Sequence, residues 1–406
     1  MNAAAWRLTL AAAALMALVA GARSAFGLFV SPLNTASDIG LASLSFALAL
    51  GQLAIGIAQP AIGALSDRFG AARVIVAGAA LLATTTVLPA AWPLAAVALP
   101  ALVASAVAGS AVASNGLLLG EVNRAVPAAR AGLAVALVGA GASVGQLLIG
   151  PATQWAIAHQ GWVWALTATA LFSLLALPLA LPFKRAAHGA PARPAQPVAD
   201  VLCDLRVSLA YPFKDARFWR VASSFGVCGF HIAFLSVHMP GVIERCGLPD
   251  ALAGLWIAVA GAANIAGSLA IGLALKRHDA ARLLAGLYLV RAAGVAALLL
   301  LPPTPVVLIG FALLMGASFM ATLPPTSQLI ARQHGVQRLG TLFGVVMLVH
   351  QVGSFAGIWF GGWVAQSSGA DDWTWRLDIL LALVAAALVW PRATTERSLR
   401  GAVAGA

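Results

Sequence analysis

Long apolar runs separated by short polar segments follow one another along the whole chain of 406 residues. A helix that crosses a bilayer needs roughly 20 apolar residues, and about twelve runs reach that length. With an apolar window of ~19 residues, the predicted helices are approximately 8–33, 41–64, 74–92, 97–120, 131–154, 163–183, 219–242, 251–274, 282–301, 305–330, 340–365 and 376–392. The pattern therefore predicts an all-α membrane protein.

The composition supports this class of protein. Hydrophobic residues make up 61% of the chain and charged residues 9%, whereas soluble proteins contain about 25% charged residues. The net charge of +11 does not indicate nucleic-acid binding, because the Lys and Arg residues lie in short loops between the apolar runs. Cys203, Cys228 and Cys246 are too scattered for a disulfide framework or a metal site, and no cofactor is expected.

The basic residues predict how the helices cross the membrane. If the N-terminus is inside, 20 of the 24 Lys and Arg residues lie on the inner side. Arg245 and Arg376 lie on the outer side. The remaining two, Arg23 and Arg291, lie within spans. Short cytoplasmic loops collect Lys and Arg, so both termini are expected in the cytoplasm.

The two halves of the chain repeat each other. Residues 272–282 align with residues 63–73 at an offset of 209. Residues 231–240 align with residues 23–32 at an offset of 208. Such repeats are typical of secondary transporters, whose binding sites lie near the bilayer midplane between the halves. The predicted division is an N-terminal six-helix bundle (1–183), a cytoplasmic linker (184–218) and a C-terminal six-helix bundle (219–406).

The polar segment 63–73 connects the second and third predicted helices. It reads Gly-x-Leu-x-Asp-Arg-x-Gly-x-x-Arg. At this place in the chain the pattern resembles the signature loop of the major facilitator superfamily, and the resemblance implies the major facilitator fold. It also implies that Asp67 helps to latch the cytoplasmic side of the two halves, with Arg68 and Arg73 as charge partners. The alternative is a positive-inside hairpin without that role. The expected gate residues are Gly63, Asp67, Arg68, Gly70, Arg73 and, from the repeated loop, Arg277.

Two arginines fall inside predicted spans, where a charge costs about 2.5–3.5 kcal/mol and usually faces a cavity or a partner. Arg23 lies in the first span, which the resemblance places on the central cavity, and it can offer a fork of donors to a carboxylate. Arg291 lies in the ninth span, usually peripheral in this family, so packing, a lipid-edge position and a functional role all stay open. No Asp or Glu is predicted near the centre of a span, and Asp378 is placed near the outer end of the last one. Arginines inside the spans without acidic residues near the span centres predict a negatively charged substrate.

Other polar residues inside the spans are candidates to contact that substrate. The candidate substrate-binding residues are Arg23, His231, His350, Gln351, Gln52, Asn115, Gln146 and Asn264. For the Gln and Asn residues, hydrogen bonding between helices is an equally good interpretation. His231 occupies the repeat position of Arg23, so the two are expected to face each other across the cavity. His231 and His350 are the candidates for proton coupling, because an unperturbed His titrates at about pH 6.5.

Three stretches indicate a branch of the superfamily. Residues 23–29, 335–344 and 350–355 resemble the monocarboxylate and oxalate–formate branch, especially its bacterial members. The chain departs from that branch in its eighth span, where animal monocarboxylate carriers place an Asp–Arg pair and this sequence has Asn264. A small organic anion is therefore the expected substrate class, and the bacterial inner membrane is the expected location.

The leading hypothesis is a secondary transporter that moves a small organic anion by alternating access, coupled to a proton. One alternative is an exporter of an amphiphilic drug or metabolite, and another is a membrane sensor with a transporter fold. A membrane enzyme is not favoured, because the sequence shows no catalytic or metal-binding pattern. The expected partners are the anion, a proton and the lipid bilayer, without nucleic acid, and the expected oligomeric state is a monomer.

Overall fold

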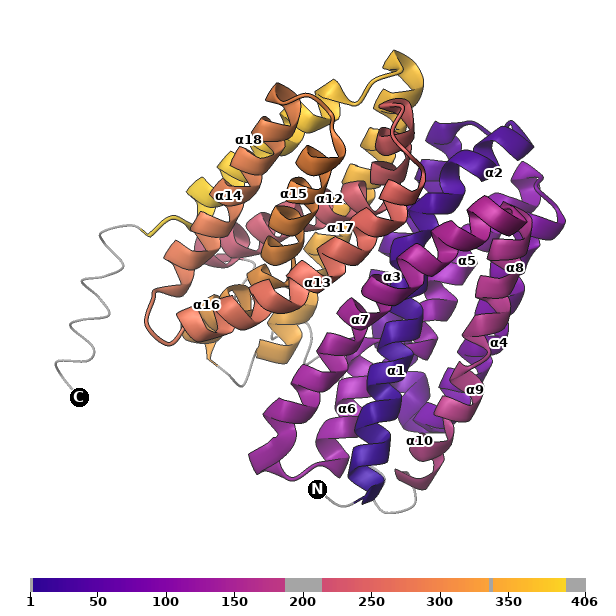
Figure 1. Ribbon diagram of the computed structural model, residues 1–406. Helices are drawn as coiled ribbons and strands as arrows, with labels where there is room; N and C mark the ends of the chain where they lie inside the picture. Colours follow the sequence, from indigo (N-terminus) through magenta and orange to yellow (C-terminus); the bar gives the residue numbers. More distant parts are fainter. Residues whose placement is uncertain (1–2, 187–213, 336–338, 392–406) are drawn as a thin grey trace.

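The computed structural model describes residues 3–186, 214–335 and 339–391, and every regular element in these ranges is a helix. The N-terminal half contains α1 (Ala3–Ala25), η1 (Phe26–Phe29), α2 (Val30–Ser37), α3 (Leu41–Phe69), α4 (Ala71–Ala91), α5 (Ala95–Val112), α6 (Asn115–Ala125), α7 (Ala128–Gln160), α8 (Trp162–Ser173), α9 (Ala176–Leu179) and α10 (Leu181–Ala186). The C-terminal half contains α12 (Ala216–Arg245), α13 (Ala251–Ala274), α14 (Ala280–Leu300), α15 (Pro305–Ser318), η3 (Met320–Thr322), α16 (Leu323–His334), α17 (Leu339–Ser368) and α18 (Asp372–Val389). Figure 1 shows the two halves side by side.

Most of these helices are long and apolar enough to cross a membrane. Within the described residues, 11 helical spans meet that requirement. The twelfth helix, α18, carries three charged residues, Asp372, Arg376 and Asp378. The prediction of an all-α, multi-pass membrane protein is confirmed.

Several predicted spans are interrupted rather than continuous. The predicted helix 97–120 breaks at Ala113 and Ser114, and the Ser114 hydroxyl then accepts the backbone N–H of Leu117 at the start of α6. The predicted helix 305–330 breaks at η3, and α16 restarts with two prolines in its first turn, where the missing N–H costs nothing. The apolar runs continue through both breaks, so hydropathy alone did not predict them.

The loop predicted at 63–73 is much shorter in the structure. Helix α3 continues to Phe69, so Asp67 and Arg68 lie in its last turn, and α4 begins at Ala71. Gly70 alone separates the two helices, with a φ of +87° that favours glycine. The residues of the predicted linker at 187–213 lie outside the described residues, and its two ends are helical, in α10 and α12.

The two halves pack by the same scheme. Helix α1 packs along α7, and their repeat equivalents α12 and α17 pack along each other. Both pairs approach closely through glycine: a Cβ on Gly145 would overlap the carbonyl oxygen of Ala17, and a Cβ on Gly229 would overlap that of His350. Small residues of this kind let transmembrane helices pack backbone to backbone.

The halves meet along two equivalent seams, α3 with α17 and α7 with α13. Near the start of α3, the backbone N–H of Ala42 donates to Oε1 of Gln366 at 2.7 Å, and at mid-helix Gly56 still lies against Gln351. Further along α3, no described atom lies within 4 Å of a Cβ placed on Gly63, and the same holds for Gly272 late in α13. The halves therefore touch at the end that carries α2 and diverge toward the N-terminus, as Figure 1 shows.

Candidate functional site

Arg23 lies close to the middle of the first span, which runs from Ala3 to Ser37. Its side chain is exposed and forms no ion pair with any described residue. Four residues later, Gly27 packs directly against the backbone of Ser236 and Val237 in α12. Arg23 therefore lies about one helical turn before the point where this span meets α12 of the C-terminal half.

The candidate residues of α3, α7 and α17 lie at or beside the seams between the halves. Gln351 is buried against Gly56 of α3, and the neighbouring His350 is half-buried, with its Nδ1 3.4 Å from Oε1 of Gln351. Gln146 on α7 is half-buried and packs against Gly261 of α13. Gln52 on α3 is half-buried as well. The structure thus brings Gln351 to the α3–α17 seam, with His350 beside it, and Gln146 to the α7–α13 seam.

The side-chain amide of Asn264 forms hydrogen bonds to two other residues of the protein. Its Nδ2 donates to the Ser143 hydroxyl across the α7–α13 seam at 3.0 Å, and its Oδ1 accepts the backbone N–H of Met320 at 2.9 Å. The side chain is 1% exposed, so the helix-bonding interpretation describes this residue better than substrate contact. Asn115 is the first residue of α6, and its side chain lies outside the described residues.

His231 does not face Arg23 across the seam, contrary to the expectation from the repeat. Its side chain is fully buried inside the C-terminal half. Nε2 lies 3.2 Å from the carbonyl oxygen of Asp378 and 3.0 Å from the Oδ1 atom of the same residue. Both neighbours are acceptors, so Nε2 carries the proton, and only the carbonyl contact has hydrogen-bond geometry.

Asp378 is a carboxylate at membrane depth, where the sequence predicted none. It is fully buried and meets α12 at His231, 15 residues from Ala216 and 14 from Arg245, the two ends of that helix. The apolar run of the last span begins just after Asp378, which made it look like the edge of the helix. The helix begins at Asp372 instead, so Asp378 lies about 9 Å inside it.

Arg291 is also fully buried, which excludes a lipid-edge position. Its Nε donates to the Ser318 hydroxyl at 3.1 Å, and its Nη2 donates to the carbonyl oxygens of Ser318 and Phe319 at 2.6 and 3.3 Å. The guanidinium also lies over the Tyr288 ring, 5.6 Å from its centroid. Arg291 therefore stabilises the break between α15 and η3, because it supplies donors to the carbonyl oxygens of the two residues at the break.

The predicted gate residues lie where the halves diverge. Asp67 is exposed and forms no ion pair with a described residue, including Arg68 and Arg73. Arg68 lies over the Phe69 ring, and Arg73 donates to the Phe69 carbonyl oxygen at 3.4 Å. Arg277, in the repeated loop, is exposed too. In this conformation the expected charge partners of Asp67 are not engaged, and its latch role stays a prediction.

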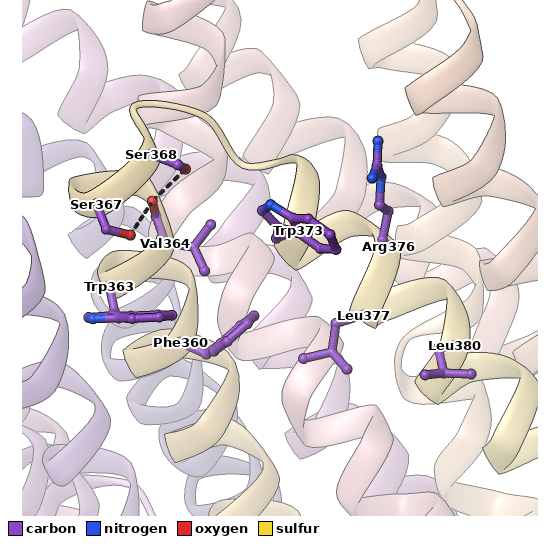
Figure 2. A pocket seen from close by; sticks show the side chains of 9 residues that line it. All are labelled: Phe360, Trp363, Val364, Ser367, Ser368, Trp373, Arg376, Leu377 and Leu380. Carbon is purple, nitrogen blue, oxygen red and sulfur yellow. Dashed lines mark hydrogen bonds between the residues drawn. The ribbon is translucent and has the colours of Figure 1, made fainter.

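A groove of about 630 Å³ lies apart from both seams. It is lined only by α17 and α18, both in the C-terminal half, and Figure 2 shows Trp363 and Trp373 among its walls. Arg376 stands over the Trp373 ring, 5.1 Å from its centroid. Tryptophan is typical of the membrane–water interface, so this groove belongs to the outer surface of the bundle rather than to a site between the halves.

Sequence comparison identifies the family to which this arrangement belongs. A sequence model of the Major Facilitator Superfamily matches residues 12–358 and again residues 221–404. The chain belongs to this superfamily and is a secondary transporter, not an enzyme. No curated protein matches its sequence.

Solved structures share the fold at low sequence identity. The chain is similar to the nucleoside transporter NupG (TM-score 0.76, 14% identity, 95% of this chain and 98% of that chain). It is similar to the xylose transporter XylE from E. coli in an inward open conformation (TM-score 0.72, 17% identity, 96% of each chain). It is also similar to a bacterial homologue of the human lysosomal transporter Spinster, in an inward-facing conformation (TM-score 0.72, 14% identity, 96% of this chain and 97% of that chain). At these identities the likeness establishes the fold and not the substrate.

Proposed function

We propose that this transporter carries a small organic anion, such as a monocarboxylate, by alternating access and together with a proton. The observation that carries the proposal is the position of Arg23, a cation near the middle of the first span and close to the contact with α12. Its side chain is exposed and forms no ion pair among the described residues. A charge at that depth is costly unless something compensates it. A bound carboxylate supplies that compensation through two parallel N–H···O bonds to the guanidinium.

The charges of the described seam residues support an anion rather than a cation. The candidates that accompany Arg23 are neutral amides and a histidine, Gln52, Gln146, Gln351 and His350, and none is a carboxylate. The arginine therefore attracts anions and repels cations, while the amides can donate hydrogen bonds to the remaining oxygens of the substrate.

The structure is open at one end only, as alternating access requires of an open state. The halves touch at the end with α2 and diverge at the end with Asp67 and Arg277. With both termini in the cytoplasm of a bacterial cell, as the basic residues predict, this is an inward-open state. Two of the similar structures are named as inward open or inward-facing, which agrees with this proposal. In the opposite state, Asp67 would come close to the charges of the other half.

Coupling to a proton predicts a pH dependence of substrate affinity. If substrate and proton bind cooperatively, each raises the affinity of the other by the same factor, typically about 5–150-fold. We expect the affinity to rise as the external pH falls from about 7.5 to about 5.5, a range that brackets the reference pKa of histidine.

Uptake into proteoliposomes tests the proposal. Labelled pyruvate, formate and oxalate are offered with and without a pH gradient to the wild type and to Arg23→Lys, Arg23→Ala and Arg376→Gln. Lysine keeps the charge but not the fork, so Arg23→Lys should weaken binding and Arg23→Ala should abolish it. Arg376→Gln is the matched control, because Arg376 is an exposed arginine in the groove away from the seams.

Normal anion uptake by Arg23→Ala would show that Arg23 is structural and would remove the main support for an anionic substrate. Uptake that ignores the pH gradient would favour a uniporter or an anion exchanger. If none of the three anions is carried while amphiphilic drugs are exported, the efflux alternative describes the protein better.

A further inference from the structure

The C-terminal half contains a cluster of ionisable side chains that the anion site does not use. His231, Arg291 and Asp378 come from α12, α14 and α18, and each has a relative exposure of 0%. Charged residues inside a membrane are costly and usually mark an ion or proton pathway. The cluster is separate from Arg23, which is exposed on α1.

The polar atoms of this cluster are not fully paired with one another. Four buried atoms have no hydrogen-bond partner among the described residues: Nδ1 of His231, Nη1 of Arg291 and both carboxylate oxygens of Asp378. Nε2 of His231 lies 3.2 Å from the carbonyl oxygen and 3.0 Å from Oδ1 of Asp378. Arg291 lies on α14, which packs along α18, and forms no ion pair with Asp378. Burying a polar atom without a hydrogen-bond partner costs free energy. Four such atoms in one cluster therefore indicate a functional role rather than a role in stability.

The cluster can accommodate two charge states of Asp378. As a carboxylate, Asp378 offers a negative charge to compensate the permanent charge of Arg291, and its Oδ1 lies 3.0 Å from Nε2 of His231. As a neutral acid it loses the attraction of Arg291, but it also avoids the cost of a buried anion. Because each charge state of Asp378 has a favourable contribution that offsets its cost, the site is suited to take up and release a proton.

Polar groups lie between this cluster and the seam between the halves. The Phe319 carbonyl oxygen accepts from both Arg291 and the Thr322 hydroxyl, at 3.3 and 2.9 Å. The Thr322 hydroxyl lies 3.3 Å from the sulfur of Cys228. The next residue of α12, Gly229, packs against the backbone of His350 on α17. Nδ1 of His350 lies 3.4 Å from Oε1 of Gln351, which packs against α3 of the other half.

We propose that Asp378 is the proton-binding group of this transporter, that His231 and Arg291 position it, and that protons reach it from the seam by way of His350. The step is a proton transfer only: a proton from water at the seam ends on a carboxylate oxygen of Asp378, and no other bond changes. Asp378 lies on α18, which packs against α12, α14 and α17. The ionisable side chains buried on the first two helices are Cys228, His231 and His238 on α12 and Tyr288 and Arg291 on α14, and α17 contributes the half-buried His350.

This inference deepens the proposed function and rests on it for the coupling, but not for the proton site. Protonation removes the negative charge that holds α18 toward Arg291 on α14, and these two helices pack along each other. A change in that attraction alters how α18 and α12 pack against α17, the helix that forms a seam with α3. Proton binding and the alternation between states are thereby linked, and the linkage is reciprocal.

Infrared difference spectroscopy of the purified protein in lipid nanodiscs tests the site without any substrate. Lowering the pH should produce the C=O stretch of a protonated, buried carboxylic acid in the wild type. Asp378→Asn should lose this band, Asp378→Glu should shift it, and the control Asp372→Asn, an exposed residue of the same helix, should keep it. If Asp378→Asn does not fold, the double variant Arg291→Gln with Asp378→Asn removes both charges together and should lose the same band.

Transport measurements separate this inference from the proposed function. With labelled pyruvate as the probe, Asp378→Asn should lose uptake driven by a pH gradient and keep equilibrium exchange. A band that persists in Asp378→Asn, or an unchanged response of that variant to the gradient, overturns the proton site even if anions are carried. A titrating band that belongs to Asp378 in a protein that carries no anion overturns the anion assignment and leaves the proton site intact.

Discussion

The N-terminal and C-terminal halves have the same packing scheme but different interiors. Among the described residues, the buried side chains of the N-terminal half include no Asp, Glu, His, Lys or Arg, and its polar groups are Ser, Thr and Gln. The buried Asp, His and Arg residues in the described part of the chain all lie in the C-terminal half: His231, His238, Arg291, Asp371 and Asp378. Repetition of a fold therefore does not imply repetition of its chemistry.

The clearest contrast is between Arg23 and His231, which are 208 residues apart and occupy the same position of the repeat. Arg23 is exposed, whereas His231 is fully buried. Arginine stays charged at every physiological pH and needs water or an anion nearby, but a neutral histidine needs only a hydrogen-bond partner. The difference suggests that the N-terminal half supplies a group for the substrate and the C-terminal half supplies a group for the proton.

The largest expected effect on stability comes from breaking the buried cluster. Asp378→Leu leaves Arg291 without a compensating charge and should cost about 3–5 kcal/mol of stability, and Arg291→Met should cost a similar amount. The double variant should be more stable than either single variant, because it removes both buried charges. Thermal unfolding in detergent measures the cycle. Simple additivity of the two single changes would show that the charges do not interact.

A smaller loss is expected at the seam between α7 and α13. Asn264→Ala removes the hydrogen bonds to Ser143 and to the N–H of Met320, and should cost about 1–3 kcal/mol because the Met320 N–H loses its partner. Ser143→Ala is the matched control, since it removes only the contact across the seam. If both changes cost the same, the bond to Met320 adds nothing.

Arg23 should contribute to transport and not to stability. Its side chain is exposed and unpaired among the described residues, so Arg23→Ala should change the free energy of unfolding by less than about 0.5 kcal/mol while it abolishes anion binding. Unfolding curves and binding measurements on the same preparation give both values. A large loss of stability would show that Arg23 is a structural arginine, like Arg291. The N-terminal half would then not differ from the C-terminal half in the role of its arginine.

The smallest expected effect is at Asp67. In the structure its carboxylate has no described partner, so Asp67→Asn should leave the stability of this state unchanged. If Asp67 latches the opposite state, the loss of an ion pair of about 0.2–1 kcal/mol shifts the balance toward this one by up to about fivefold. A Ser45→Cys reporter, buried under Gly362 here, should then be labelled more slowly. Equal labelling and an equal transport rate would remove Asp67 from the mechanism.

The sequence by itself determined the class of protein, because apolar runs of bilayer length have no other stable location than a membrane. It also determined the family, through the polar segment at 63–73, and the internal repeat. It did not determine the breaks at Ser114 and η3 or the true start of α18 at Asp372, because these depend on caps and contacts that hydropathy does not report.

Only the tertiary structure decided which polar residues share a site. Helical spacing placed Arg23 and His231 at equivalent positions, but whether a side chain faces a seam or the interior of a bundle depends on which helices pack beside it. The contact between His231 and Asp378 joins residues 147 positions apart, on α12 and α18. A sequence reports each of these residues separately, and a buried charge becomes interpretable only when the packing shows what compensates it.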